Sequence, residues 1–494
     1  MLMPAPDSNT IAQKARLAAG LAELLPPESV IADPIALKAY ESDALTAYRQ
    51  APLLVTLPRS TAEVSAVLKY CSANKLKVVP RGAGTSLSGG ALPLADGVVL
   101  GLGKLNKILE IDLENRCAVV QPGVQNLAIS NAVLASGFYY APDPSSQIAC
   151  TIGGNVAENS GGVHCLKYGL TTNNLLGLEV VLISGEVVRF GGKHLDSGGY
   201  DLIGIMTGSE GLLGVVTEVT VRLLKRPETA RALVAGFPSN EQAGAAVAAV
   251  IGAGIIPAGM EMMDRPAIHA AEDFVHADYP LDAEALLIVE LDGPAIECNH
   301  LLKQVTDIVQ ANGASSLRVS ESEAERLKIW AGRKAAFPAV GRISPDYLCM
   351  DGTIPRRRLP EVLTRMAELS VKYGLRVANV FHAGDGNLHP LILFDANKGE
   401  LENAEKFGAD ILRLCVEVGG VLTGEHGVGV EKRDLMPEMF SELDLDQQIR
   451  LKLAFDPDQL LNPGKVFPNL HRCAELGRMH VRGGALPHPE LPRF

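Results

Sequence analysis

The chain has 494 residues, of which 47% are hydrophobic and 21% are charged, and its net charge is −12. This composition is typical of a globular protein with two or three domains, and it argues against a disordered chain. The negative net charge argues against nucleic-acid binding. Basic clusters are also scarce, since Arg356, Arg357 and Arg358 form the only tight one.

The cysteines and the N-terminus favour a reducing, cytoplasmic setting. The eight cysteines include no C-x-x-C pair, so we expect neither an iron–sulfur cluster nor a structural zinc site in this chain. Residues 1–20 lack the basic start and apolar core of a signal peptide. Residues 243–260 carry no charge, but they are mainly Ala and Gly and are interrupted by Pro257. This run predicts a buried helix rather than a membrane span.

Four segments and a tail follow one another along the chain. Residues 1–50 have the apolar spacing of a helical lead-in. Within residues 51–226, a helix is expected to begin at Ser60 or Thr61, and strands are predicted at 53–58, 77–80, 97–102, 118–123, 177–183 and 214–223. The segment 227–414 alternates strands and helices, which predicts an antiparallel sheet with helices on one face. Residues 415–468 return toward the first domain, and 469–494 contain no motif that we can interpret.

Three glycine-rich segments lie in the first domain. Residues 80–90, PRGAGTSLSGG, follow a predicted strand, and their glycines allow backbone N–H groups to approach a phosphate. The third glycine of a Rossmann motif and the G-K-[ST] ending of a Walker loop are both missing. A plain glycine-rich turn remains an alternative for this loop alone. The further segments 141–162 and 207–223 indicate a long, flat ligand that lies against the backbone in several places.

Two histidines flank an Asp-Gly pair in FHAGDGNLHP, residues 381–390. Asp-Gly is typical of a two-residue hairpin turn, and with Asp385 and Gly386 as that turn, His382 lies directly opposite His389 on one face. Glu425 and His426 lie in a second, glycine-flanked loop. Two histidines and one carboxylate are a common ligand set for Zn²⁺, Mn²⁺ or Fe²⁺. The alternative is an ordinary hairpin with one buried and one exposed histidine.

The ordered motifs carry a family resemblance. PRGAGTSLSGG, TIGGNVAENSGG, GSEGLLGVVTEVTVRL, FHAGDGNLHP, GEHGVG and LNPGKVFP resemble the vanillyl-alcohol oxidase family, and in particular its branch of FAD-linked 2-hydroxyacid dehydrogenases. Residues 329–356 favour the glycolate dehydrogenases within that branch. The resemblance implies an α+β fold. It would comprise a PCMH-type FAD-binding domain of two α+β subdomains (51–226), an α+β cap domain with an antiparallel sheet (227–414) and a closing segment (415–468).

The resemblance also implies which residues bind FAD. The loop at 80–90 is expected to hold the pyrophosphate, Pro142 and the segment 151–161 to lie along the flavin and ribityl chain, and Glu210 and Val216 to reach the adenosine side. The implied cofactor-binding residues are Arg81, Gly82, Ala83, Gly84, Thr85, Ser86, Gly89, Pro142, Thr151, Gly153, Gly154, Asn155, Gly161, Glu210, Val216 and Asn462. Some relatives attach FAD through a histidine in the first loop. Here Thr85 and Ser86 stand in that loop, so non-covalent FAD is expected.

By the same resemblance, His382, His389 and Glu425 bind a divalent metal and His426 is the general base. Such a metal lowers the pKa of a substrate hydroxyl, and a neutral imidazole can accept its proton. Arg333 matches the arginine that binds the substrate carboxylate, although it could instead cap a helix or pair with a glutamate. Where relatives often carry a lysine just before the position of Asp351, this chain reads LCMDG, which favours a small monocarboxylate.

The resemblance implies oxidation of glycolate or a small D-2-hydroxy acid, with hydride transfer to flavin N5. It implies a catalytic subunit that works with a second flavin-binding subunit and an iron–sulfur subunit, through which it could associate with the inner face of the membrane. One alternative is a D-lactate dehydrogenase with a cytochrome or quinone acceptor. Another is a flavin-binding subunit without substrate chemistry, but such a subunit could dispense with the histidine and glutamate cluster.

Overall fold

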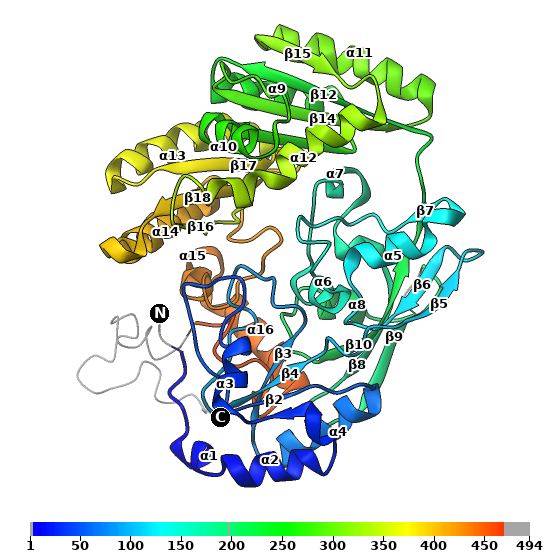
Figure 1. Ribbon diagram of the computed structural model, residues 1–494, viewed down its shortest axis with the longest axis vertical. Coiled ribbons are helices and arrows are strands. Elements are labelled where there is room, and N and C mark those ends of the chain that lie inside the picture. The colour runs from blue at the N-terminus through cyan, green and yellow to red at the C-terminus, as the bar shows by residue number, and fades with distance from the viewer. Residues whose placement is uncertain (1–2, 196–197, 469–494) are drawn as a thin grey trace, which may run out of the picture.

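A computed structural model describes residues 3–195 and 198–468 of the chain (Figure 1). The described residues form a lower and an upper body in the view of Figure 1. The lower body contains the first part of the chain, to about residue 225, together with the C-terminal helices. The upper body is built around a single large sheet. The candidate active site lies where loops of the two bodies meet.

Two sheets form the core of the lower body. In the first sheet the strand order is β1 (Val30–Ile31), β2 (Leu54–Thr56), β4 (Gly97–Gly101) and β3 (Lys77–Arg81). In the second, antiparallel sheet the order is β5 (Ile108–Asp112), β6 (Cys117–Val120), β10 (Val215–Arg222), β8 (Leu175–Val181) and β9 (Val187–Gly191). A short pair joins β7 (Phe138–Tyr139) to β11 (Leu224–Lys225). Because β1 pairs with β2, the lead-in is more than helical: it supplies one strand of the first sheet.

Helices pack around these sheets and connect them. They are α1 (Ser8–Ala12), α2 (Lys14–Ala22), α3 (Pro34–Leu37), α4 (Thr61–Ala73), α5 (Asn126–Val133), α6 (Ile152–Glu158), α7 (Cys165–Tyr168), α8 (Leu202–Met206), α15 (Met436–Met439) and α16 (Glu442–Phe455). Helix α4 begins after Ser60, whose Oγ accepts a hydrogen bond from the Glu63 N–H at 3.2 Å. Its buried face packs against residues of both sheets, including Val98 and Val215, and so joins the two sheets in one core.

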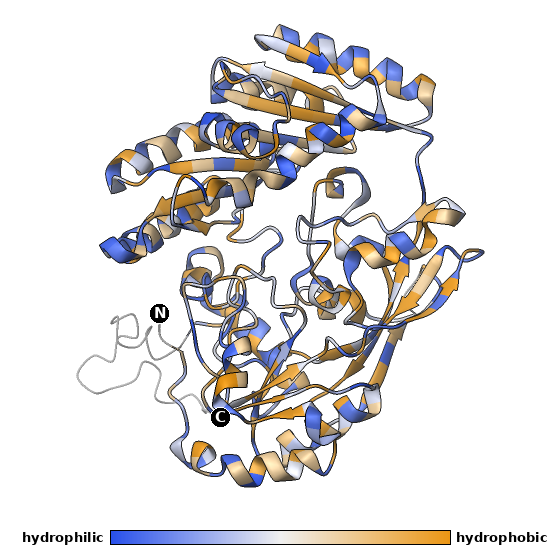
Figure 2. Ribbon diagram, viewed as in Figure 1, coloured by the Kyte–Doolittle hydropathy of each residue, from blue (hydrophilic) through white to orange (hydrophobic). Residues whose placement is uncertain are grey.

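The upper body contains a seven-stranded antiparallel sheet. Its strand order is β15 (Ser316–Val319), β12 (Thr229–Phe237), β14 (Ala285–Gly293), β13 (Gly259–Asp264), β17 (Val377–His382), β18 (Asn387–Phe394) and β16 (Asp346–Cys349). The central strands are mainly hydrophobic in Figure 2, whereas the surrounding helices mix hydrophobic and hydrophilic residues. This contrast fits a sheet that is buried under amphipathic helices.

Helices cover both faces of the seven-stranded sheet, so the expectation of helices on one face is wrong. They are α9 (Asn240–Gly252), α10 (Arg265–Val275), α11 (Ala295–Ala311), α12 (Glu323–Val340), α13 (Leu359–Tyr373) and α14 (Leu401–Glu417). Leu233 and Ala235 of β12 pack in the same cluster as residues of α9, α11, α13 and α14. The alternate residues Ala232 and Val234 pack in a cluster with α10 and α12. Since successive strand residues face opposite sides, the two clusters lie on opposite faces.

The uncharged run 243–260 forms most of α9, as expected, and reaches the start of β13. Ser239 caps α9, because its Oγ accepts a hydrogen bond from the Gln242 N–H at 3.2 Å. Val247 and Val250 of the helix are buried in the core of the upper body. Among the described residues, no helix is both long and apolar enough to cross a membrane.

Candidate active site

The hairpin of β17 and β18 differs from its predicted register. His382 pairs with Asn387 and His389 pairs with Val380, so residues 383–386 form a four-residue loop. The N–H groups of Asp385 and Gly386 both donate to His382 O, at 3.3 and 3.1 Å, which closes a wider turn than the predicted Asp385–Gly386 turn. The predicted direct pairing of His382 with His389 is therefore wrong.

Long-range contacts determine this wider turn. The Gly384 N–H donates to Met260 O on the neighbouring strand β13 at 3.0 Å. Gly386 has a φ of +82°, and a Cβ atom there would collide with Ile354 O. The register shift is two residues, and an even shift keeps side chains on the same face. His382 and His389 thus remain neighbours, with ring centroids 5.0 Å apart and planes at 86°.

The three side chains implied as metal ligands come together in the structure. One donor atom from each of His382, His389 and Glu425 lies within 4.8 Å of the others. The Nε2 atoms of His382 and His389 lie 3.4 and 3.0 Å from Glu425 Oε1. Gly161 leaves the room that this carboxylate needs, because a Cβ atom at residue 161 would collide with Glu425 Oε2.

Each histidine is oriented through its other ring nitrogen. The Nδ1 of His382 lies 2.8 Å from Glu261 Oε1, and the Nδ1 of His389 lies 3.3 Å from Met350 O. When Nδ1 donates its proton to such an acceptor, Nε2 presents its lone pair to a metal. The donor set, its convergence and the acceptors behind it fit a divalent cation. Glu261, which orients the His382 ring, was not expected from the sequence.

Asp351 holds the loop that carries Glu425 and His426. Its carboxylate accepts hydrogen bonds from the N–H groups of Gly424 (3.0 Å), Glu425 (3.2 Å) and His426 (2.9 Å). It also pairs with the fully buried Lys432, at 3.2 Å from Nζ. Burial alone would raise the pKa of Asp351, but the neighbouring His426 and Lys432 hold that pKa well below its usual value. The site therefore depends on an internal ion pair that orders its backbone.

His426 lies beside the cluster of His382, His389 and Glu425, but its Nε2 is farther from Glu425 Oε1 than the Nε2 atoms of the other two histidines. Its ring stacks on that of His389, with centroids 4.9 Å apart and planes at 10°, and its Nε2 lies 3.9 Å from Glu425 Oε1. Burial lowers the pKa of His426 to about 4, an effect that Asp351 offsets only in part. A histidine in this state is neutral near pH 7 and can accept a proton.

Arg333 lies on α12 and pairs with a glutamate, which was one of the alternatives for it. Its Nε donates to Glu261 Oε2 at 2.8 Å, and its Nη2 lies 2.6 Å from the same oxygen. The Arg333 side chain is 1% exposed. Glu261 thus joins Arg333 to His382, because its second oxygen faces the His382 ring. The neighbouring Lys334 lines the cavity described next, whereas Arg333 does not.

A cavity of about 490 Å³ runs from the three glycine-rich segments to the histidine cluster. Fifteen of the expected site residues line it: Arg81, Gly82, Ala83, Gly84, Thr85, Ser86, Thr151, Gly153, Gly154, Asn155, Glu210, Val216, His389, Glu425 and His426. Ser146, Glu158 and Ser209 also line it, from within the expected glycine-rich segments, whereas Pro122, Lys334 and Phe337 were not expected from the sequence. The buried Thr151 Oγ1 has no hydrogen-bond partner among the described residues. A long cavity with a backbone-rich wall and such a free polar atom fits an extended dinucleotide.

The Arg81 side chain packs against the backbone of the first glycine-rich loop at Gly84. Its Nη1 donates to Ser42 O at 2.8 Å, and a Cβ atom at Gly84 would collide with the guanidinium. Gly84 has a φ of +73°, which glycine adopts without strain. The loop therefore passes directly over a fixed positive charge at the cavity wall, an arrangement suited to a diphosphate.

The remaining expected cofactor residues, Gly89, Pro142, Gly161 and Asn462, do not line the cavity, and they contact other parts of the chain. The Pro142 O accepts a hydrogen bond from Asn126 Nδ2 at 3.1 Å. Asn462 Nδ2 donates to Gly90 O at 3.0 Å and to Glu210 O at 2.7 Å. A Cβ atom at Gly89 would lie 2.9 Å from a methyl carbon of Val430.

Glu210 links the first domain to the C-terminal loop. Its two carboxylate oxygens accept hydrogen bonds from the N–H groups of Val428 and Gly429, each at 2.7 Å. Those residues directly follow the loop of Glu425 and His426. Glu210 therefore ties the glycine-lined end of the cavity to its histidine end, in addition to lining the cavity.

Comparisons with known proteins agree with this geometry. Residues 52–191 match the FAD binding domain family, and residues 226–466 match the C-terminal domain family of FAD linked oxidases. The glycolate oxidase subunit GlcD of Escherichia coli strain K12 is 60% identical over 456 residues, which cover 92% of this chain and 91% of that protein. The D-lactate dehydrogenase of Archaeoglobus fulgidus is 34% identical over 436 residues, 87% of this chain and 95% of that protein.

Solved structures confirm the fold. The structure of p-cresol methylhydroxylase with substrate bound superposes with a TM-score of 0.80 at 18% identity, over 95% of this chain and 99% of that one. The 4-ethylphenol oxidase from Gulosibacter chungangensis, in an isoeugenol complex, gives 0.78 at 18% identity, over 96% and 100%. The expected α+β architecture with a PCMH-type FAD-binding domain is thus confirmed. The chain belongs to the family of FAD-linked oxidases and is an FAD-dependent oxidoreductase.

Proposed function

We propose that this chain oxidises glycolate, or a similarly small D-2-hydroxy acid, to the 2-oxo acid. The observation that carries the proposal is the convergence of His382, His389 and Glu425, with His426 beside them, where His389, Glu425 and His426 line one end of the FAD cavity. The 60% identity to a glycolate oxidase subunit supports glycolate as the substrate. The relatives named D-lactate dehydrogenase, at 34% identity or less, support D-lactate as the second candidate.

The chain's own residues would bind, orient and deprotonate the substrate. Bound FAD would supply the hydride acceptor at N5, and a divalent cation held by His382, His389 and Glu425 would supply Lewis acidity for the hydroxyl and carboxylate oxygens. His426 accepts the hydroxyl proton, since its ring is neutral and lies beside the ligand cluster. Lys334, which lines the cavity from helix α12, offers positive charge for the substrate carboxylate, whereas Arg333 is paired with Glu261 and supports His382 through it.

We also propose how FAD is attached and which subunits the chain works with. Thr85 and Ser86 line the cavity in the loop where some relatives use a histidine, so FAD is held without a covalent bond. Acid precipitation should then release the yellow colour into the supernatant. We further propose a cytoplasmic catalytic subunit that passes electrons to a second flavin-binding subunit and an iron–sulfur subunit. The E. coli relative carries the name of a subunit, which supports such a complex.

The central test is anaerobic flavin reduction with a panel of 2-hydroxy acids of both hands. Glycolate should bleach the flavin of the purified protein faster than either lactate enantiomer. His426→Ala should retain FAD and metal but lose bleaching, because the proton acceptor is gone. His389→Ala should lose the metal, as measured by elemental analysis. His300→Ala, at an exposed position on α11, is the matched control and should behave as the wild type.

The outcomes separate the parts of this proposal. Normal bleaching of His426→Ala would remove His426 from the base role. Unchanged metal content in His389→Ala would refute the metal site. If the wild type were reduced by D-lactate and not by glycolate, the second candidate function would replace the first.

A further inference from the structure

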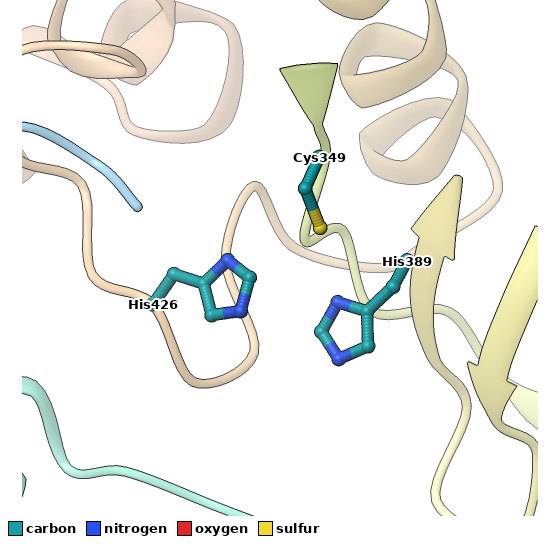
Figure 3. Close-up of side chains that lie close together, drawn as sticks. All are labelled: Cys349, His389 and His426. Atoms are coloured by element: carbon teal, nitrogen blue, oxygen red, sulfur yellow. The ribbon is translucent and has the colours of Figure 1, made fainter. Parts of the chain in front are cut away.

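A second group of donor atoms lies behind the ligand cluster. Cys349, at the end of β16, pairs with Leu391 of β18, which places its side chain close to His389. One donor atom from each of Cys349, His389 and His426 lies within 4.8 Å of the others. Figure 3 shows the Cys349 thiol directed toward the space between the two imidazole rings, each of which has a ring nitrogen on that side. Cys349 belongs to neither the ligand set nor the base of the proposed function.

One of these donors lacks a partner in the protein. The Nδ1 of His426 is buried and has no hydrogen bond among the described residues. Leaving a buried polar atom unpaired costs about 1–3 kcal/mol, so such atoms usually have a partner outside the protein. The parallel stacking of the His389 and His426 rings, at 10°, holds both side chains beside the thiol.

The chemistry of the three donors selects a class of ligand. A thiolate with two imidazoles prefers soft or borderline cations, whereas two imidazoles with a carboxylate also accept harder ones. Zinc bonds of about 2.3 Å to sulfur and about 2.0 Å to nitrogen place tetrahedral donors roughly 3.5 Å apart, which small side-chain rotations from the present positions reach. We propose that Cys349, His389 and His426 bind a soft divalent cation such as Cd²⁺ or Zn²⁺, and that this binding inhibits the enzyme.

A cation bound by Cys349, His389 and His426 excludes a cation bound by His382, His389 and Glu425, because both sites use His389. The cation displaces the thiol proton of Cys349 to solvent and forms a sulfur–metal bond. It also takes the lone pair of the His389 nitrogen that otherwise donates to Met350 O. The imidazole proton then resides on Nε2 and faces Glu425 Oε1 at 3.0 Å, so that Nε2 has no lone pair for the first cation. His426, as a ligand, no longer accepts a proton.

Binding of the cation at Cys349 does not depend on the proposed function, whereas its inhibitory effect rests on that function. The test adds one equivalent of Cd²⁺ to the full-length protein with FAD bound and examines the cadmium by X-ray absorption. We expect sulfur scattering from one ligand in the wild type. Cys349→Ser and Cys349→Ala should lose that scattering, and the Cd²⁺ concentration that halves flavin reduction should rise at least ten-fold. Cys71→Ser, at a buried cysteine in the core around α4, is the matched control and should behave as the wild type.

Each outcome bears on the proposal. Absence of sulfur scattering in the wild type, or its persistence in both Cys349 variants with FAD retained, would overturn the site. Loss of scattering with unchanged Cd²⁺ sensitivity would overturn the inhibitory role. If no 2-hydroxy acid reduced the flavin, the proposed function would fail, while the absorption measurement would still decide whether the cation binds at Cys349.

Discussion

Substitution of Asp351 by Asn tests whether the internal ion pair orders the active-site loop. The change keeps the side chain's shape but removes the charge that faces Lys432, and both residues are completely buried. It also places an amide among the N–H groups of residues 424–426, which need acceptors. Removing one partner of a buried ion pair costs about 3–5 kcal/mol, because the other charge stays buried without compensation. We expect the free energy of unfolding to fall by about that amount.

Urea denaturation followed by circular dichroism measures this loss of stability. Elemental analysis measures the metal content, which should fall because the loop that carries Glu425 is displaced. The matched control is Asp458→Asn, which breaks a pair between side chains that are 65% (Lys75) and 47% (Asp458) exposed. That change should cost less than about 1 kcal/mol. Because the folded-state pKa of Asp351 is depressed, its stabilisation is present above the ordinary carboxyl pKa of about 4 and is lost as pH falls further. A cost for Asp351→Asn no larger than the control's, with the metal retained, would refute the reasoning.

Three further substitutions test other parts of the structure. Glu261→Gln should weaken metal binding about 10–100-fold in calorimetric titration, because it removes the charged acceptor behind His382, and equal affinity would contradict that role. His164 bridges Asp143 (2.8 Å) and Glu290 (3.0 Å); burial lowers its pKa, but the two carboxylates raise that pKa well above its usual value. The protonated bridge therefore stabilises the fold fully below about pH 6.5 and is lost as pH rises through the raised pKa, so the Tm of the wild type should fall toward alkaline pH more steeply than that of His164→Gln. Parallel Tm curves would contradict this reading. Gly386→Ala should lower the free energy of unfolding by about 1–3 kcal/mol through its φ of +82°, and an unchanged urea midpoint would show that the turn adapts.

The sequence alone determined the local elements and the chemical types at the site. Periodicity and capping residues placed the start of α4 at Ser60 or Thr61 and predicted a buried helix in the uncharged run that α9 occupies, because helix signals act over a few positions. The glycine-rich segments pointed to a long ligand with phosphate groups and the paired histidines to a cation, and the family resemblance then implied FAD. Even the wrong hairpin register preserved the shared face of His382 and His389, since the error was an even number of residues.

Only the tertiary structure decided the partners that lie far apart along the chain. Glu261 supports His382 across 121 residues and pairs with Arg333, yet in sequence it is one residue of a buried strand. Asp351 orders the loop of His426 from 75 residues away. The hairpin turn widened because contacts from Met260 O and near Ile354 outweighed the preference of Asp-Gly for a two-residue turn. Short-range patterns predict helices, turns and the chemical groups present at the site. Burial and long-range hydrogen bonds decide which of these groups meet and which turn forms.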